Sequence, residues 1–410
     1  MRPISSELST RCPPTCANWH DVSALYLLEP AAPDAAWAPF AGAVPLSELR
    51  AGMWRLRERW ARALNARATG IVAPHVTGHY QLHGPPLIDA DHIVGPAWIA
   101  DATFAPKLPM RAIGGAKRLL HAGRAVAWRL DAGQRWEGTF EQGDGLVVDG
   151  RALAGTYDLI TALEQLLFGD TLESLSETTS AIPDGTIVLG NPAAIALHGA
   201  EVEPGVVLDA RKGAIILERG VQVRSGSRLE GPFWAGEGTW ILGGQLRHVS
   251  AGPRCRLHGE ISTSVFGGYS NKSHDGFVGH SVIGEWVNLG AGTITSNLKN
   301  TYGPIRLDVA GARLETGRTN LGALIGDHAK TAIGTLLPTG AVVGAGANLF
   351  AATRAQKYTA PFAWGGDTAE RLAVDEFIAT AKRILPRRDV AVDADMEASL
   401  RAMHRRMTGA

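Results

Sequence analysis

Apolar residues near the start of the chain recur every three to four positions in two segments. Residues 46–64 show this spacing, which predicts an amphipathic helix with Ser47 as its N-cap and the arginines of 50–62 on its wet face. Residues 158–168 show it again, and Gly169 is placed to end that second helix. The first part of the chain is therefore expected to contain at least two helices.

Short apolar runs around these helices predict strands. Residues 24–28 and 70–73 are the clearest, because proline or another turn-forming residue follows each run closely. Strands mixed with helices predict one α/β domain over residues 22–170. Residues 1–21 are polar and contain prolines, so we expect a loose arm there.

From about residue 182 the spacing changes to a step of six. Ile283, Leu289 and Thr295 follow one another at this step, and a glycine comes directly after each of the first two. Helical spacing does not return until about residue 367. A second series with the same step consists of Ile325, Thr331, Leu337, Val343 and Leu349. A step of six that persists over this length is a repeat signature.

Each six residues supply one short strand and a corner, and three such units make a coil of about 18 residues. Stacked coils pair their strands in parallel and place the apolar residues in inward columns. Residues 182–350 are therefore expected to form a left-handed parallel β-helix, since an antiparallel sandwich would show hairpin turns and longer units. Helical spacing at 367–407 predicts C-terminal helices that cap the solenoid or pack along its side.

The composition narrows the classes of function. Forty basic residues balance forty acidic ones, which argues against a nucleic-acid partner or an anionic lipid surface. No apolar run is long enough for a membrane span and no signal peptide is visible, so we expect a cytoplasmic protein. Cys12, Cys16 and His20 are spaced by four, but without a second cluster they favour a disordered tail over a metal site.

The most regular part of the chain resembles a known enzyme family. The stretch GHSVIGEWVNLGAGTITSN at 279–297 is similar to the acetyltransferase half of the bifunctional enzymes that make UDP-N-acetylglucosamine. In that family a nucleotidyltransferase domain precedes a left-handed β-helix, which acetylates glucosamine-1-phosphate from acetyl-CoA. The chain also resembles a group of relatives labelled sugar nucleotidyltransferases. This second resemblance lies in PLSELRAGMWRLRERW (45–60), GYSNKSHDGFVGHSVIGEWVNLGAGT (268–293) and SNLKNTYGPIR (296–306).

The resemblance implies roles for individual residues. It implies that His274 is the catalytic base and that Asn288 binds the sugar. Asn297 is then expected near the acetyl group, and Ala291 at the thioester of acetyl-CoA.

Other positions depart from the family pattern. Ser262 stands where the family has a lysine that binds the sugar phosphate, and Lys272 is the only lysine nearby. Phe277 replaces a tyrosine. The resemblance therefore implies acyl transfer but does not identify glucosamine-1-phosphate as the acceptor.

Acyl transfer needs a base beside the nucleophile and donors that face the developing oxyanion. The ordinary pKa of histidine lies near neutrality, which suits the first task. The corner with Gly290 and Gly292 is expected to leave backbone N–H groups accessible for the second, in the cofactor site. Resembling proteins build this site between the subunits of a trimer, so we expect a homotrimer. Alternatively, the asparagines form a stacked ladder of turn residues and His274 is a solvated loop residue.

The expected reaction is acyl transfer from acetyl-CoA to an amino or hydroxyl group of a sugar phosphate or nucleotide-sugar.

The N-terminal domain lacks a glycine-rich phosphate loop after its first strand. It would need Mg²⁺ only if it were an active sugar-1-phosphate nucleotidyltransferase, which is the alternative function. Asp89 and Asp91 resemble a turn more than a metal site. A non-catalytic scaffold is the other alternative. A zinc site of the β-helical carbonic anhydrase type is disfavoured, because His274 and His280 lack the second, closely spaced histidine pair.

Overall fold

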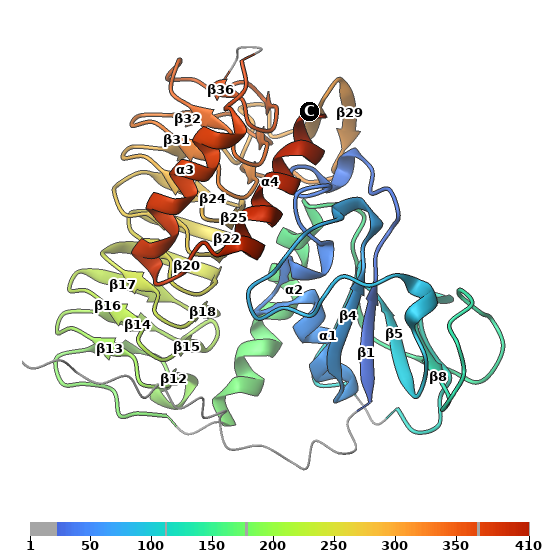
Figure 1. The fold of residues 1–410 in the computed structure, drawn as a ribbon. Coiled ribbons are helices and arrows are strands. Elements are labelled where there is room, and N and C mark those ends of the chain that lie inside the picture. Colours follow the sequence, from blue (N-terminus) through green and yellow to red (C-terminus); the bar gives the residue numbers. More distant parts are fainter. Residues whose placement is uncertain (1–22, 111–112, 177–178, 367–369, 410) are drawn as a thin grey trace, which may run out of the picture.

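The structure, a computed structural model, describes residues 23–110, 113–176, 179–366 and 370–409. Figure 1 shows an α/β domain beside a long solenoid, with two C-terminal helices against the solenoid. The expected arm at 1–21, with Cys12, Cys16 and His20, lies outside the described residues. Within the described part of the chain, no helix combines the length and apolar character needed to cross a membrane.

A six-stranded sheet forms the core of the N-terminal domain. Its strand order is β4-β1-β5-β8-β7-β9, with β1 parallel to both neighbours and β8 antiparallel to both of its own. Leu25 and Leu27 of β1 are fully buried, as expected for an apolar strand in the middle of a sheet. The strands are β1 (Ala24–Leu28), β4 (Arg67–Val72), β5 (Ala97–Asp101), β7 (Arg118–His121), β8 (Arg124–Leu130) and β9 (Gly145–Val147). A separate pair consists of β6 (Phe104–Pro106) and β10 (Gly150–Ala152).

The helix predicted over 46–64 is wrong in its first half. Leu46–Glu48 is a 3-10 turn, β2 (Arg50–Ala51) and β3 (Trp54–Arg55) form a hairpin, and the helix α1 covers only Leu56–Leu64. Ser47 is not its cap, because the Ser47 N–H and hydroxyl donate to the buried carboxylate of Glu29 at 2.9 and 2.6 Å. A contact between distant residues thus overrides the local spacing.

The arginines of this segment do not share a wet face. Arg59 on α1 is fully buried, where it donates to the carbonyls of Ala51 and Pro106 at 2.8 and 2.9 Å and pairs with Asp170. Arg50 is also buried. Arginine in this motif therefore ties the domain together from inside.

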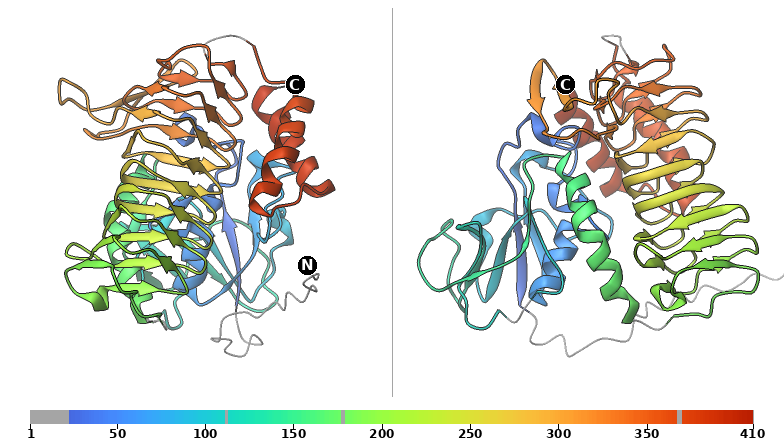
Figure 2. Two further views of the ribbon diagram at one scale, coloured as in Figure 1. Left: turned by 90° about the vertical axis from the view of Figure 1, so that its left-hand side faces the viewer. Right: turned by 180° about the vertical axis from the view of Figure 1, so that it is seen from behind.

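The second helix, α2 (Asp158–Glu173), continues past Gly169, so this glycine does not end it. Leu163 and Leu167 pack against Ile216 and neighbouring outward residues of the solenoid. Figure 2 shows α2 running between the sheet and the solenoid, along the stacked coils. Burial against three coils favours the extra helical turn.

The solenoid has three faces, each a stack of parallel strands, which is the arrangement expected of a left-handed β-helix. Face 1 contains β11 (Ile187–Leu189), β14 (Val207–Asp209), β17 (Ser227–Glu230), β24 (Phe277–Gly279), β27 (Ile294–Thr295) and β32 (Leu336–Leu337). Face 2 contains β12 (Ile195–Leu197), β15 (Ile215–Leu217), β18 (Phe233–Ala235), β25 (Val282–Glu285), β30 (Leu324–Ile325), β33 (Val342–Val343) and β35 (Tyr358–Thr359). The long strands β20 (Gly244–Ala251) and β22 (Glu260–Gly268) run through both faces. Face 3 contains β13 (Glu201–Val202), β16 (Gln222–Val223), β19 (Trp240–Ile241), β21 (Arg256–Leu257), β23 (Asn271–Lys272), β26 (Asn288–Leu289), β31 (Lys330–Thr331), β34 (Asn348–Leu349) and β36 (Trp364–Gly365).

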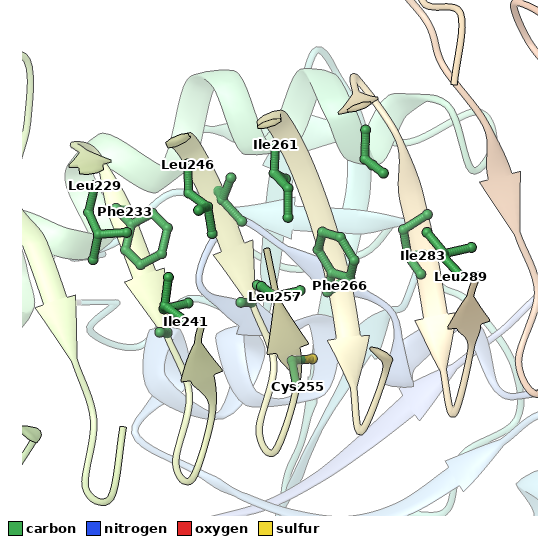
Figure 3. Packing of buried hydrophobic residues seen from close by; sticks show 14 of the residues in the cluster. Leu229, Phe233, Ile241, Leu246, Cys255, Leu257, Ile261, Phe266, Ile283 and Leu289 are labelled. Atoms are coloured by element: carbon green, nitrogen blue, oxygen red, sulfur yellow. The ribbon is translucent and has the colours of Figure 1, made fainter. Parts of the chain in front are cut away.

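The predicted six-residue step is confirmed. Leu324 pairs with Val342, 18 residues further on, and both belong to face 2. The residue at each step points inward, and Figure 3 shows the resulting columns of buried leucine, isoleucine and phenylalanine side chains. Apolar columns stacked coil on coil form the largest core of the molecule.

One coil carries a long excursion. Val282 pairs with Leu324, 42 residues further on, and the extra chain includes the hairpin of β28 (Arg306–Val309) and β29 (Ala312–Glu315). Its apolar residues join a core with Phe40 and Leu46 of the N-terminal domain. The excursion thus attaches the solenoid to that domain.

The C-terminal helices α3 (Val374–Ile384) and α4 (Ala394–Thr408) pack along the side of the solenoid, which is one of the two expected arrangements. They cover the corner between faces 2 and 3, where Tyr269, Trp286 and His328 stack on one another in successive coils. We call these three residues the aromatic corner. Each has a φ between 57° and 62°, a conformation that is costly for large side chains.

Candidate functional site

His274 lies at the opposite side of the coil, on the corner between faces 3 and 1. It follows β23 and is exposed. The N-terminal domain and α2 cover face 2, which this corner faces away from. We call residues 273–276 and the stacked residues 290–293 the His274 corner.

Hydrogen bonds stack the two turns of this corner directly. The Gly292 N–H donates to the Asp275 carbonyl at 2.9 Å, so Ala291 lies one coil above the His274 turn. In the coil below, His258 Nδ1 lies 3.3 Å from the Asp275 carboxylate. The residues expected at the base and at the thioester are therefore brought together.

The glycine corner does not offer the free donors that its sequence suggested. The Gly290 N–H donates to the carbonyl and hydroxyl of Thr331, the Gly292 N–H to Asp275, and the Thr293 N–H to the Gly290 carbonyl. Stacking of the coils consumes these groups, because parallel strands pair each N–H with the adjacent coil. Within the described stretch 290–293, Ala291 is the one residue whose N–H makes no backbone hydrogen bond.

Lys272 points into the solenoid. Its side chain is fully buried in the inward column between Leu257 and Leu289, and its ammonium donates to the carbonyls of His274 and Asp275. Burial lowers the pKa of Lys272 to about 8, although the Asp275 carboxylate opposes this shift. Lys272 thus holds the turn that presents His274, and its position does not favour contact with a phosphate.

Asn288 belongs to a ladder of outward residues on face 3. The Asn271 side-chain amide donates to Asn288 Oδ1 at 2.8 Å, and the Ser273 hydroxyl donates to Asn271 Oδ1. Both asparagines are half-buried. The ladder fixes the Asn288 amide beside the His274 corner, so the turn-ladder alternative describes its contacts within one chain.

Ser262 and Asn297 lie at a different corner, between faces 1 and 2. Asn297 Nδ2 lies 2.8 Å from His280 Nδ1, and the Ser262 carbonyl accepts from the His280 N–H. Burial lowers the pKa of His280. Within one chain the expected site residues are therefore divided between two corners.

An apolar column borders the His274 corner on face 1. Phe277, Ile294 and Leu336 occupy equivalent outward positions in successive coils. Ile294 and Leu336 are each 42% exposed, and Ile333, at the same corner, is 79% exposed. Exposed apolar side chains in a contiguous row are typical of a surface that another chain covers.

A buried charged cluster, which the sequence did not predict, lies at the junction of the three parts of the molecule. A cavity of about 180 Å³ there is lined by Arg55, the aromatic corner and α4. Arg55 donates to Glu285 at 2.8 Å, and the Glu285 N–H donates to the Asp327 carboxylate at 2.9 Å. Burial, followed by the nearby Glu285 charge, raises the pKa of Asp327 to about 8. The many charged residues of 45–60 could have indicated this buried cluster, but the local spacing predicted that they face solvent.

The loop after β1 begins with a buried carboxylate, that of Glu29. Glu29 accepts from the N–H groups of Leu46 and Ser47, and His75 Nε2 lies 2.8 Å from it. Two backbone donors at the far end of this loop are thus occupied by a carboxylate of the chain itself. Asp89, Asp91 and His92 form an exposed cluster at a 3-10 turn (Ala90–His92) on the surface. Such exposed groups do not fit an Mg²⁺ site shared with a bound nucleotide.

A three-sided parallel solenoid with a six-residue step defines the hexapeptide-repeat class of proteins. No family model matches the chain. It is 40% identical over 91 residues to a bifunctional sugar-1-phosphate nucleotidylyltransferase/acetyltransferase of Sulfurisphaera tokodaii, which is 22% of this chain and 23% of that protein.

Two further relatives, each named bifunctional protein GlmU, match 85 residues, or 21% of this chain. The protein of Methanocaldococcus jannaschii is 35% identical over 21% of its own length. That of Methanococcus vannielii is 38% identical over 20% of its length. The chain thus matches less than a quarter of each of these relatives.

Proposed function

We propose that the protein transfers an acyl group from acetyl-CoA to an amino or hydroxyl group of a sugar phosphate or nucleotide-sugar. The observation that carries this proposal is the His274 corner, where an exposed histidine lies one coil below Ala291 and beside the Asn271–Asn288 ladder. The partial similarity to enzymes named as acetyltransferases supports the same chemistry.

In the proposed reaction His274 accepts the proton of the attacking amino or hydroxyl group. The nucleophile forms a bond to the thioester carbonyl, the resulting oxyanion is stabilised by donors, and the thiol leaves as the acyl group is transferred. The Ala291 N–H is the candidate donor within this chain. Asn288, held by Asn271, is the candidate for orienting the acceptor.

The proposed site is completed by a second copy of the chain in a homotrimer. One chain divides the site residues between two corners, and the exposed column of Phe277, Ile294 and Leu336 adjoins the His274 corner. A neighbouring subunit seated on this column would bring another corner to His274. Light scattering is expected to give a trimer for the wild type and a smaller species for Ile294→Lys.

The proposal is tested by thiol release from acetyl-CoA with a panel of amino sugars, sugar phosphates and nucleotide-sugars. His274→Ala is expected to lower kcat by about 10²–10⁴-fold, because a base acts mainly in the transition state. Acetyl-CoA affinity, measured by calorimetry, should change little.

His92→Ala is the matched control, since His92 is also exposed but lies on a surface turn of the N-terminal domain. A His274→Ala variant that assembles normally and turns over within about threefold of wild type would remove His274 from the mechanism. A wild type that neither binds acetyl-CoA nor releases thiol with any acceptor would contradict the function itself.

We further infer that the N-terminal domain has a structural role without efficient nucleotidyl transfer. Glu29, directly after β1, occupies the N–H groups of Leu46 and Ser47, and the acidic turn at Ala90–His92 does not fit a shared Mg²⁺ site. Pyrophosphate release from any nucleoside triphosphate with a hexose-1-phosphate would overturn this inference.

A further inference from the structure

Three arginines gather where the aromatic corner turns into face 3, although the chain as a whole has equal numbers of basic and acidic residues. Arg254 and Arg256 flank the start of β21, and Arg388 ends the 3-10 turn Leu385–Arg388 that follows α3. All three side chains are half-buried. We call them the arginine cluster.

Backbone carbonyls, not carboxylates, hold most of this cluster. Arg256 Nη1 donates to the carbonyls of Gly238 and Cys255, both at 2.9 Å, and Arg388 Nε donates to the Arg254 carbonyl at 3.2 Å. The Arg256 guanidinium also lies 4.0 Å from the ring centre of Trp240. These contacts fix the orientation of the guanidinium groups without neutralising them.

Too few anions balance the cluster. Among the described residues, its only ion pair joins Arg254 to Asp389, whose side chain is 83% exposed. The Nε and Nη2 groups of Arg256 and the Nη2 group of Arg388 have no hydrogen-bond partner in the described part of the chain. Burial, and then the charge of Arg388, lower the pKa of Arg256 to about 10.

We propose that the arginine cluster binds a phosphate or diphosphate group of a small-molecule ligand. Fixed guanidinium groups with free N–H donors match the geometry of phosphate oxygens. A carboxylate ligand would carry too little charge to balance three arginines beside a single exposed aspartate.

The cluster lies on the same face as the proposed acyl-transfer site. Arg256 pairs with Asn271, and Asn271 pairs with Asn288, each one coil further on. Since stacked strands are about 4.8 Å apart, the backbones of Arg256 and Asn288 lie roughly 10 Å apart on this face. If the proposed function holds, this phosphate belongs either to the acceptor or to the diphosphate of the acyl donor.

Calorimetry of the full chain with inorganic pyrophosphate tests the site without relying on acyl transfer. Binding is expected in low salt and should weaken at least about tenfold in Arg256→Gln and in Arg388→Gln, which corresponds to about 1.4 kcal/mol. Arg306→Gln is the control, because Arg306 is an exposed arginine paired with Glu315 on the distant hairpin. Thermal melting should show that each variant is folded.

A wild type that binds neither pyrophosphate nor phosphate at about 10 mM overturns the proposal, as does unchanged binding in both cluster variants. In acyl-transfer assays, a raised KM for the acceptor alone would assign the phosphate to the acceptor, and a raised KM for acetyl-CoA alone would assign it to the donor. If the cluster variants lose pyrophosphate binding but keep both KM values, the arginine cluster is an anion site that takes no part in acyl transfer.

Discussion

The His274 corner and the aromatic corner are built by the same six-residue step, yet they differ in what covers them. Left-handed positions at the His274 corner are filled by the glycines Gly276 (φ 133°) and Gly292 (φ 71°). The corresponding positions at the aromatic corner hold Tyr269, Trp286 and His328. A left-handed conformation costs a non-glycine residue about 1–2 kcal/mol, so the aromatic residues need compensating contacts.

Those contacts come from outside the solenoid. The N-terminal domain, α3 and α4 pack on the aromatic corner, and Trp286 is 9% exposed beneath them. Nothing in the described part of one chain covers His274. The comparison teaches that large side chains occupy left-handed corner positions where other parts of the molecule cover them, whereas the glycine-filled His274 corner is left open for ligands.

The largest effect is expected from Trp286→Ala at the covered corner. Removing a buried tryptophan should lower the free energy of unfolding by about 3–5 kcal/mol. Urea denaturation would measure this loss, and His274→Ala, measured in parallel, should change stability by less than about 0.5 kcal/mol. Equal losses at the two corners would show that covering does not distinguish them.

Between pH 6.5 and 8, the covered corner should dominate the pH dependence of stability, because Lys272 at the His274 corner titrates only near and above pH 8. The pKa of Asp327 is raised to about 8 in the folded protein, so the stability from its protonated form is lost as pH rises toward 8. The lowered pKa values of His79 and His328 act in the opposite direction below about pH 6.5. Between pH 6.5 and 8, stability should therefore fall by at most about 1.4 kcal/mol per unit.

Asp327→Asn should flatten this slope, since asparagine keeps the acceptor for the Glu285 N–H but carries no proton that titrates. Denaturation midpoints at several pH values would show the difference. An unchanged slope in the variant would assign the effect to other groups.

The smallest effect distinguishes the two interpretations of the asparagine ladder. Asn271→Ala and Asn288→Ala both remove the hydrogen bond between the two asparagines, and Asn271→Ala also removes the acceptor of the Ser273 hydroxyl. Asn288→Ala should therefore cost about 0.5–1.5 kcal/mol of stability, and Asn271→Ala at least as much. If Asn288 orients the acceptor, Asn288→Ala should also raise the acceptor KM well beyond Asn271→Ala. Similar kinetics in the two variants would favour a purely structural ladder.

Local spacing predicted the parts of the fold that depend on neighbours in sequence. The series ending at Val343 and Leu349 gave the inward columns, because each coil repeats the same three faces. Local spacing gave the wrong role for Ser47, whose partner is Glu29, 18 residues away. It also placed Arg59 in solvent, although Arg59 is buried against Asp170. Pairings between distant residues leave no periodic trace in the sequence.

The candidate site shows the same limit. His274 and Ala291 lie in stacked turns, since they are about one coil apart in the sequence, but their roles stay a prediction. The motif could not show that Lys272 points inward or that Asn297 meets His280, because side-chain direction depends on where each turn begins. The buried set of Arg55, Glu285 and Asp327 depends on how three parts of the chain pack, which no single motif encodes.

The position of α2 has a consequence for how the molecule opens. A solenoid whose coils contact only their neighbours can fray from an end, one coil at a time. Because α2 contacts β18, β20 and β22, these coils cannot open one at a time without losing their packing on the helix. Their amide hydrogens should therefore exchange together, at the rate of a single cooperative opening. The strands β11 and β13 lie at the end of the stack, with a neighbouring coil on one side only. Their amide hydrogens should therefore exchange sooner than those of the coils beneath α2.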